Sequence, residues 1–324
     1  GEYAWIDYNQ DGVQQLNEFE WAQFPDQAKY VKLFTPTNDF IKADQLTFNY
    51  HLSLSPRLLL SQYPSGTWQS FLARFNWNSS WQHQRKTFAN GKLSWNPLLQ
   101  NIPDSALVMM QGILSNVISF NRFSTRWGLD ISHYLTETNA ILSYGFEQRS
   151  QQDWLLKFRV NWNRKLSNIV EFKKGQLELF TPAFANRNYS IGEIKIKPQL
   201  QWIKGTSLLL NGSFQYQERK NSPLFGGERS IAKVWMAEMR YNRLQKGAFN
   251  AKISIHQIEY PHALKNTVSY IMLDGLVPGI NWVWMCSYQK RISQRLELNL
   301  QYDGRKSGLA STIHMGRAGV TALF

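Results

Sequence analysis

Near the amino terminus, acidic and amide side chains alternate around a glycine, in the sequence Asp7-x-Asn9-x-Asp11-Gly12-x5-Glu18. Ca²⁺ prefers about six to eight oxygen ligands, and calcium-binding loops supply them from alternating positions, with a glycine at the sharp turn and a closing carboxylate. The spacing therefore predicts a structural calcium site. Its predicted ligands are Asp7, Asn9, Asp11, the Val13 carbonyl, Gln15 and Glu18.

Two features separate this loop from a complete EF-hand. Gln14 occupies the position where a hydrophobic residue normally pairs two such loops, and the six residues before Asp7 are too few for an entering helix. We interpret the segment as a solitary calcium loop. The alternative is an acidic turn in which Asp or Asn caps the start of a helix. In either case we expect a short helical piece to follow, to about Ala28.

The other residues that could do chemistry are scattered along the chain. No histidine lies in a recognisable serine- or carboxylate-spaced motif, and nucleophilic catalysis needs a nucleophile, a base and an orienting group. The single cysteine, Cys286, excludes an internal disulfide and a multi-cysteine metal site. We therefore do not expect an enzyme. The six histidines are His51, His83, His133, His256, His262 and His314.

Composition limits the class of protein. The 324 residues are 43% hydrophobic with a mean hydropathy of −0.41, and no run of about eighteen apolar residues could form a transmembrane helix. Aromatic residues make up 14%, which is too many for a disordered chain. A polar average with many aromatic residues is typical of strands that present one face to lipid and the other to water.

The chain is strongly basic, with a formal net charge of +13. Its Lys and Arg residues lie in turns and at alternate strand positions, and they form no basic helix or stripe. We therefore do not expect a nucleic-acid partner. Anionic lipid head groups and acidic partners explain the excess better.

From Leu46 to the last residue, apolar and polar side chains alternate with a period of two. Sustained runs of about ten such residues are typical of transmembrane β-barrels. The alternative is a water-soluble β-sandwich or β-helix. A sandwich buries the apolar faces of two sheets against each other and rarely places Trp at successive same-face positions near strand ends. One such run places Trp154, Leu156, Phe158, Val160 and Trp162 opposite Asp153, Lys157, Arg159, Asn161 and Asn163.

The pattern predicts an all-β fold: an antiparallel up-and-down barrel of about fourteen strands over residues 45–324, after a periplasmic lead segment with the calcium loop over residues 1–44. The predicted strands are 45–55, 68–84, 110–122, 125–137, 139–150, 153–163, 166–180, 188–202, 205–219, 228–243, 247–258, 278–290, 294–304 and 309–324.

Link lengths predict the orientation. Short turns near 164–165, 204–205, 245–247 and 292–293 alternate with longer links at 181–187, 220–227, 259–277 and 305–308. Short turns of such barrels face the periplasm. We therefore expect the last strand to end there and the lead segment to start there. The stretch 85–109 is long on the side of the short turns, as a folded-in segment or a further strand pair.

Charged residues of both signs alternate with the apolar positions and should face the lumen. They could line a selective pore or form ion pairs between strands, and we favour the structural role. They are Arg74, Arg149, Lys157, Arg159, Lys195, Lys197, Arg240 and Lys252, with Asp130, Glu147, Glu193, Glu238 and Glu297.

Several stretches resemble the C-terminal barrel region of large, mostly uncharacterised Bacteroidota outer-membrane proteins, and the resemblance covers essentially the whole chain. It implies a long region upstream, but no established activity and no catalytic residues. The stretches are Tyr3-Ala-Trp-Ile-Asp-Tyr-Asn-Gln-Asp-Gly, Phe34-Thr-Pro-Thr-Asn-Asp-Phe, Tyr270-Ile-Met-Leu-Asp-Gly-Leu-Val-Pro-Gly-Ile-Asn-Trp, Ser287-Tyr-Gln-Lys-Arg, Leu300-Gln-Tyr-Asp-Gly-Arg-Lys-Ser and Thr312-Ile-His-Met-Gly-Arg-Ala-Gly-Val-Thr-Ala-Leu-Phe.

The expected function is that of a membrane anchor and structural subunit of a larger outer-membrane complex for secretion or assembly. Its partners would be outer-membrane lipids and lipopolysaccharide, and other outer-membrane or periplasmic proteins. The alternative is a porin-like channel or transporter for a small solute. A mature barrel must cross the inner membrane, so we expect a signal peptide to have been removed and further sequence to precede Gly1.

Overall fold

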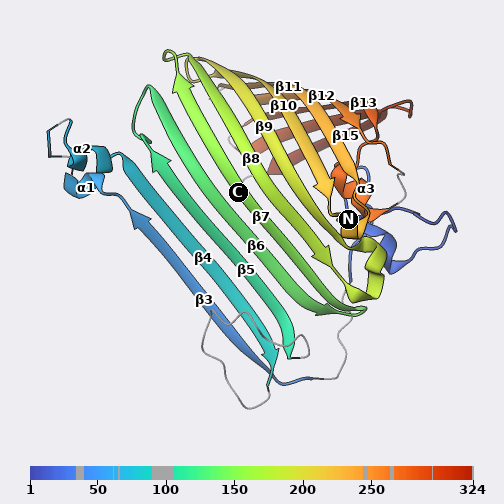
Figure 1. The fold of residues 1–324 in the computed structure, drawn as a ribbon. Coiled ribbons are helices and arrows are strands. Elements are labelled where there is room, and N and C mark those ends of the chain that lie inside the picture. Colours follow the sequence, from blue (N-terminus) through green and yellow to red (C-terminus); the bar gives the residue numbers. More distant parts are fainter. Residues whose placement is uncertain are drawn as a thin grey trace.

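The computed structural model of the chain describes residues 1–33, 40–60, 62–64, 66–89, 106–243, 247–262, 266–293 and 295–322. One antiparallel sheet of 13 strands dominates it, and each strand pairs with its neighbours in sequence (Figure 1). The strands are β3 (Ala43–Leu54), β4 (Phe75–Phe88), β5 (Leu107–Phe120), β6 (Trp127–Leu142), β7 (Gly145–Asn161), β8 (Leu166–Phe180), β9 (Tyr189–Lys204), β10 (Leu208–Asn221), β11 (Arg229–Arg243), β12 (Gly247–Glu259), β13 (Gly279–Arg291), β14 (Leu296–Ser307) and β15 (Ile313–Ala322).

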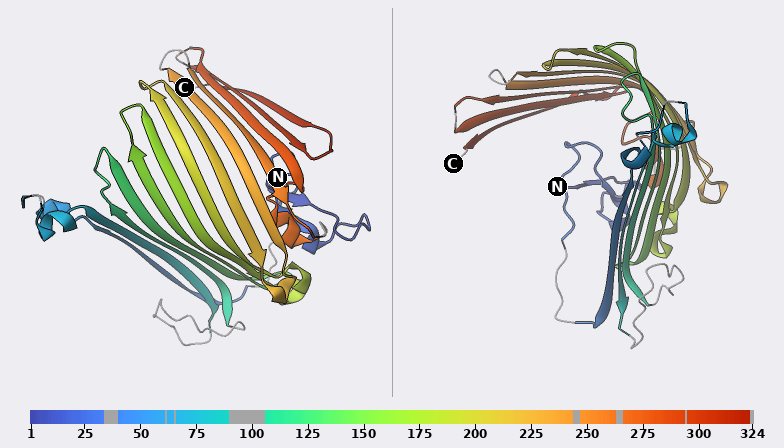
Figure 2. Two further views of the ribbon diagram at one scale, coloured as in Figure 1. Left: turned by 45° about the horizontal axis from the view of Figure 1, so that its top comes forward. Right: turned by 90° about the vertical axis from the view of Figure 1, so that its left-hand side faces the viewer.

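The period-two pattern of the sequence becomes two chemically different faces of this sheet. On one face Trp235 of β11 lies opposite Ile255 of β12, which lies opposite Trp282 of β13. The other face carries polar side chains at the alternate positions, such as Glu238 opposite Lys252. The sheet is strongly curved (Figure 2), and the polar face is the concave one, called the inner face below.

The all-β, up-and-down architecture is as predicted, but the strand count and the closure differ. Among the described residues, β3 and β15 each pair with a single neighbour, so the sheet keeps two edges. The two predicted strands 139–150 and 153–163 are largely one strand, β7, whose polar stretch 148–153 pairs with β8 throughout. That stretch was interpreted as a break between strands because it lacks outward apolar residues.

Two segments adopt a secondary structure different from the one predicted. The predicted strand 68–84 starts only at Phe75, because Trp68–Leu72 forms a helix (α2) after another short helix, α1 (Arg57–Leu60). Near the amino terminus, the expected helix to about Ala28 is replaced by a 3-10 turn, η1 (Leu16–Glu18), and a strand, β2 (Phe19–Trp21). This strand pairs with β1 (Tyr3–Trp5). None of the helices in the described part of the chain is long and apolar enough to cross a lipid bilayer.

Because β7 is a single strand, each link before it lies at the opposite end of the sheet from the end that the sequence predicted. We call the end of the sheet with residues 162–165 and 205–207 the tight-turn end, and the end with 181–188 and 260–278 the long-link end. The link 89–106 lies at the long-link end, so its placement on the short-turn side was wrong. Its residues 90–105, where a folded-in segment or a strand pair was considered, lie outside the described residues.

The chain enters the sheet at one end and leaves it at the other. β3 starts at the long-link end, whereas β15 finishes at the tight-turn end, since the sheet has an odd number of antiparallel strands. The expectation that the lead segment and the last strand meet at one end is therefore wrong.

Two segments cover the inner face at the long-link end. One is residues 1–33, and the other is residues 266–278, which include helix α3 (Thr267–Met272) between β12 and β13 (Figures 1 and 2). We call them together the plug. The buried core lies where the plug meets the sheet, and it consists of Leu179, Tyr189, Ile191, Ile258, Tyr260, Val268, Met272, Leu273 and Leu276.

Candidate functional site: the plugged inner face

A buried carboxylate joins three parts of the chain that are distant in sequence. Glu20 of β2 has Oε2 3.3 Å from Nη2 of Arg187, which ends the 3-10 segment η2 (Pro182–Arg187) between β8 and β9. Thr267 of α3 donates a hydrogen bond to Oε1 of Glu20 at 2.6 Å, and the Tyr8 hydroxyl donates to the same oxygen at 3.3 Å. Glu20, Arg187 and Thr267 are each at most 4% exposed.

The electrostatics of this cluster follow from its burial. Burial raises the pKa of the Glu20 carboxyl, and the nearby Arg187 guanidinium opposes that shift. Burial and the charge of Glu20 raise the pKa of Tyr8, so the phenol stays neutral and donates its proton to the carboxylate. Since an uncompensated buried charge is costly, the cluster favours the docked position of residues 1–33.

A second set of contacts fixes the segment around Phe24. Arg305 of β14 donates from Nη2 to Oδ2 of Asp26 at 2.6 Å, and its guanidinium stacks over the Phe24 ring at 4.2 Å. The Tyr270 hydroxyl of α3 accepts a hydrogen bond from the backbone N–H of Gln23 at 3.1 Å. Both halves of the plug therefore contact each other as well as the sheet.

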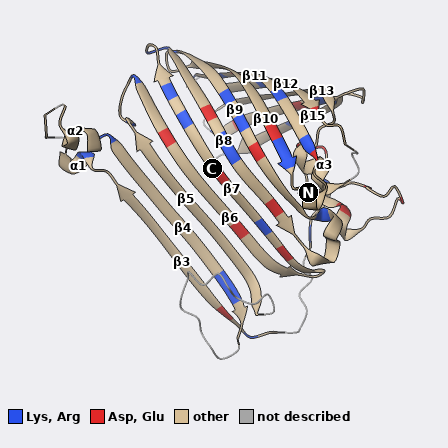
Figure 3. Cartoon of the chain, in the orientation of Figure 1, with Lys and Arg blue, Asp and Glu red and all other residues tan. Residues whose placement is uncertain are grey.

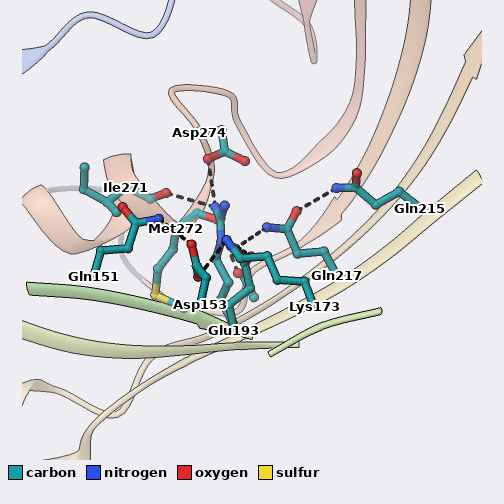
Figure 4. A network of polar contacts seen from close by, with 11 residues as sticks. Gln151, Asp153, Lys173, Glu193, Gln215, Gln217, Ile271, Met272 and Asp274 are labelled. Carbon is teal, nitrogen blue, oxygen red and sulfur yellow. Dashed lines mark hydrogen bonds and ion pairs between the residues drawn. The ribbon is translucent and has the colours of Figure 1, made fainter. Parts of the chain in front are cut away.

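Arg219 of β10 holds α3 in place through hydrogen bonds to Asp274, Ile271 and Met272, three residues that Figure 4 labels. Its Nε donates to Glu193 Oε2 at 2.8 Å, and its Nη1 donates to Asp274 Oδ1 at 2.9 Å. The same Nη1 lies 3.1 Å from the Ile271 carbonyl and 3.0 Å from the Met272 carbonyl. Carbonyls at a helix C-terminus lack intrahelical partners. The guanidinium supplies that partner and anchors the helix to the sheet.

The network continues across the sheet (Figure 4). Lys173 of β8 lies 3.1 Å from Glu193 Oε1 and 3.0 Å from Asp153 Oδ1. Gln151 donates to Asp153, and Gln217 donates to Glu193, each at 2.7 Å. Four consecutive strands, β7 to β10, are therefore cross-linked by charged hydrogen bonds on the inner face.

Sequence reasoning assigned Glu193 and Asp153 to this face but did not single out Arg219 or Lys173. Each occupies an inward position of the same alternating pattern, so the signal was present. Their mutual proximity is set by strand register. The strand members of the predicted inner-face set do lie on this face, and Arg74 lies in the link before β4. Ion pairs join Arg149 to Glu147, Lys157 to Glu171 and Arg240 to Glu238.

A cavity of about 460 Å³ remains between the plug and strands β11 to β15. Ser254 and His256 of β12 line it, with Oγ 2.9 Å from Nε2, and so does Asp274. A serine nucleophile needs its base oriented by a third group. The Asp274 carboxylate is bonded through Oδ1 to Arg219.

The predicted calcium loop is folded around its glycine. Gly12 has a positive φ of 73°, and its N–H donates to Asp7 Oδ2 at 3.0 Å. The Val13 N–H donates to Asp11 Oδ1 at 2.7 Å, and the Asp11 N–H donates to Asn9 Oδ1 at 3.1 Å. The structure therefore brings Asp7, Asn9 and Asp11 into one tight loop.

Glu18 is placed differently from the other predicted ligands. Its Oε2 accepts hydrogen bonds from Trp5 Nε1 at 2.9 Å and from the Gln15 N–H at 3.4 Å, and the side chain is buried. The Gln15 amide donates to Asp11 Oδ2. Oε1 of Glu18 and Oδ1 of Asp7 are buried without a hydrogen-bond partner. Within the described ranges, no three His, Cys, Asp or Glu side chains are grouped closely enough to hold a metal ion.

The convex face carries a broad apolar band. In β9 it extends from Ile194 to Trp202, and eight residue steps at about 3.3 Å make it about 26 Å long. Ile194, Ile196 and Leu200 are 42–50% exposed. Toward the long-link end the band gives way to charged pairs, such as Lys233 with Glu259 at 3.4 Å.

The tight-turn end is basic, as the blue segments at the upper strand ends in Figure 3 indicate. Its six links (55–74, 121–126, 162–165, 205–207, 244–246 and 292–295) contain no Asp or Glu in the sequence. We call their eight cationic residues the basic rim. They are Arg57, Arg74, Arg122, Arg126, Arg164, Lys165, Lys246 and Arg295.

Neither models of known protein families nor curated proteins match this chain. The function proposed below therefore rests on the geometry of the chain itself.

Proposed function

We propose that residues 43–322 form part of the wall of an outer-membrane β-barrel. The chain would serve as a membrane anchor and structural subunit of a larger outer-membrane complex for secretion or assembly. The observation that carries this proposal is the opposition of two faces. An exposed apolar band runs across the convex face, and a charged, hydrogen-bonded face covered by a plug lies behind it.

The dimensions of the band support the membrane assignment. Outer-membrane barrels carry an apolar band about 25 Å tall, bordered by aromatic residues. The band in β9 has a similar length along the strand, and aromatic residues border it at Trp162 and Trp202 near the tight turns and at Trp282 near the long links. A soluble protein rarely leaves so large an apolar surface uncovered.

The basic rim supports contact with anionic lipid. Lys and Arg near a membrane surface attract anionic head groups by roughly 1 kcal/mol each. The seven cations of the rim that the structure describes lie in links at one end, next to the apolar band. Phosphate-bearing lipids of the adjacent leaflet are the partner that fits this arrangement.

The plug favours an anchor over an open channel. The core residues and the Arg219 network occupy the inner face at the long-link end, and Arg305 and Arg187 fix residues 1–33 in that position. A porin-like role would require this segment to leave. Conduction therefore separates the two functions.

The experiment is a planar-bilayer recording on the protein purified from outer membranes, combined with detergent co-purification. We expect little steady conductance and recovery of a stable complex with other outer-membrane or periplasmic proteins. A double variant, Glu20→Ala with Arg305→Ala, removes both anchors of residues 1–33 and should give intermittent openings. Large, steady, ion-selective currents from the unmodified protein would favour the channel instead.

We also propose that Ca²⁺ binds the loop of Asp7, Asn9 and Asp11 and stiffens the plug. The unpartnered carboxylate oxygens of Asp7 and Glu18 support this, since buried polar atoms normally have partners. The Val13 carbonyl and Gln15 lie in the same loop. Oε2 of Glu18 stays bonded to Trp5, and Oε1 is left for the ion, whose role in this loop is structural.

A further inference from the structure

The two edge strands of the sheet run in the same direction. Each of the twelve strand junctions is antiparallel, so with 13 strands both β3 and β15 run from the long-link end to the tight-turn end. A direct junction between β3 and β15 would be parallel. An all-antiparallel wall therefore needs an odd number of further strands between these two edges.

Both edges have the amphipathic pattern of the inner strands. On β3 the outward residues Phe48, Tyr50 and Leu52 are 37–41% exposed and continue the apolar band, and on β15 Val320 lies outward beside Leu298. Edge strands in water are usually protected by charges or bulges. In a bilayer, unpaired backbone groups of an edge find no water and need a strand partner.

A second copy of this chain does not supply that partner. Two copies inserted in the same orientation are related by an axis along the membrane normal, and this rotation keeps every strand direction. Their edges β3 and β15 would again meet in parallel. The partner must therefore contribute an odd number of strands of its own.

Residues 1–33 lie at the end of the sheet where a strand antiparallel to β3 would finish. Residues 1–33 are held at the long-link end through Glu20 and Arg187, and Gly1 lies with them, because the Glu2 N–H donates to the Tyr30 carbonyl at 2.7 Å. A strand antiparallel to β3 ends at this same end. Residues 1–33 would then lie in the link that joins it to β3 across the inner face, as residues 266–278 lie in the link between β12 and β13.

We propose that an odd number of transmembrane strands, lying before Gly1 in the same polypeptide, stands between β3 and β15 and completes an antiparallel barrel. This proposal rests on the membrane location proposed above. It identifies residues 1–33 as an inward-folded link between two neighbouring strands, rather than an appendage that precedes the first strand.

The test is photo-crosslinking in intact outer membranes, with the full-length polypeptide. A photoreactive phenylalanine analogue replaces Phe48 of β3 in one variant and Val320 of β15 in another, and the linked peptides are identified by mass spectrometry. Phe172 of β8, whose cross-strand neighbours are Leu156 and Ile196, provides the matched control. We expect links from Phe48 to β4 and to peptides upstream of Gly1, and links from Val320 to β14 and to upstream peptides.

Links from Phe48 to β15 of the same chain, to another polypeptide, or to β4 alone would each overturn the proposal. Disulfide scanning of β3 against β15, in a Cys286→Ser background, gives an independent reading, and an intramolecular disulfide would also overturn it. Membrane location is measured separately by fractionation. A polypeptide in the outer membrane whose two edges cross-link to each other would overturn closure alone, whereas absence from the outer membrane would overturn both proposals.

Discussion

The carboxylate of Glu20 lies 3.3 Å from the guanidinium of Arg187, although 167 positions separate the two residues in sequence. Both side chains are about 5% exposed, so the ion pair is shielded from water and salt. Through this pair, a two-stranded element near the amino terminus is attached to a link between β8 and β9. The docking of the plug should therefore depend on it.

Glu20→Ala or Arg187→Ala should weaken the docking of residues 1–33. Removal of one partner from a buried pair leaves an uncompensated charge and costs about 3–5 kcal/mol. Hydrogen exchange of residues 19–30 in detergent micelles measures the loss. Glu259→Ala is the control, because its pair with Lys233 is exposed and exposed pairs contribute about 0–1 kcal/mol. Equal exchange in the three variants would contradict this role.

Docking should also depend on pH. Because burial raises the pKa of Glu20 above its usual value near 4.5, the docked segment binds this proton more tightly than the released one. Docking is then strongest at a pH below the usual value, and it weakens as the pH rises through the raised pKa of Glu20. Tyr8 stays neutral in this range, since its own pKa is raised. Proteolysis near Phe24–Lys29 against pH provides the readout, and Glu20→Gln should flatten the profile. If Glu20→Gln leaves the pH profile unchanged, the pH dependence of docking comes from another group.

Two adjacent leucines of β7 test which face meets lipid. Leu156 points outward between Ile131 and Phe172, whereas Leu155 points inward beside Lys173. Leu156→Arg should cost about 2–4 kcal/mol or block assembly, because it places a charge against hydrocarbon. Leu155→Arg should be tolerated on the charged inner face. Heat-modified mobility in gels compares the two, and equal behaviour would refute the assignment of faces.

The basic rim should retain anionic lipid. Arg164→Ala together with Lys165→Ala should lower the affinity for phosphatidylglycerol by about 1 kcal/mol per residue. Native mass spectrometry counts the retained lipids. Lys220→Ala with Arg229→Ala is the control, since both cations are paired with Glu218 at the long-link end. The rim would have no lipid role if both double variants retained equal numbers of anionic lipids.

Terbium can report on the calcium loop. Trp5 donates a hydrogen bond to Glu18, so a lanthanide bound beside Asp7 and Asp11 should be sensitised through its indole. Asp11→Asn should weaken the emission by removing a carboxylate ligand. Glu2→Gln, in the same segment but outside the loop, should leave it unchanged, and Trp5→Phe should reduce emission without reducing affinity. If chelator neither changes emission nor exposes Phe24–Lys29 to protease, the loop is an acidic turn.

Much of the fold follows from local sequence. Alternation with a period of two sets which side chains share a face, because successive side chains of a strand point to opposite sides. This reasoning places Trp154 and Trp282 outside and Glu193 inside, as the structure has them. It failed at residues 148–153, where polar side chains on both faces hide the continuity of β7. That one strand decided the strand count and the direction of β3.

Contacts between distant segments depend on the tertiary structure. The spacing around Gly12 predicted a tight acidic loop, since its hydrogen bonds run between residues two to five positions apart. In contrast, Glu20 meets Arg187, and Arg219 meets the end of α3, only because the sheet curves and two links fold onto its inner face. Sequence by itself therefore determined the chemistry of each face. The curvature and register of the sheet decided that the inner face is covered. They depend on the sum of many strand pairings, so no single segment of the sequence reveals them.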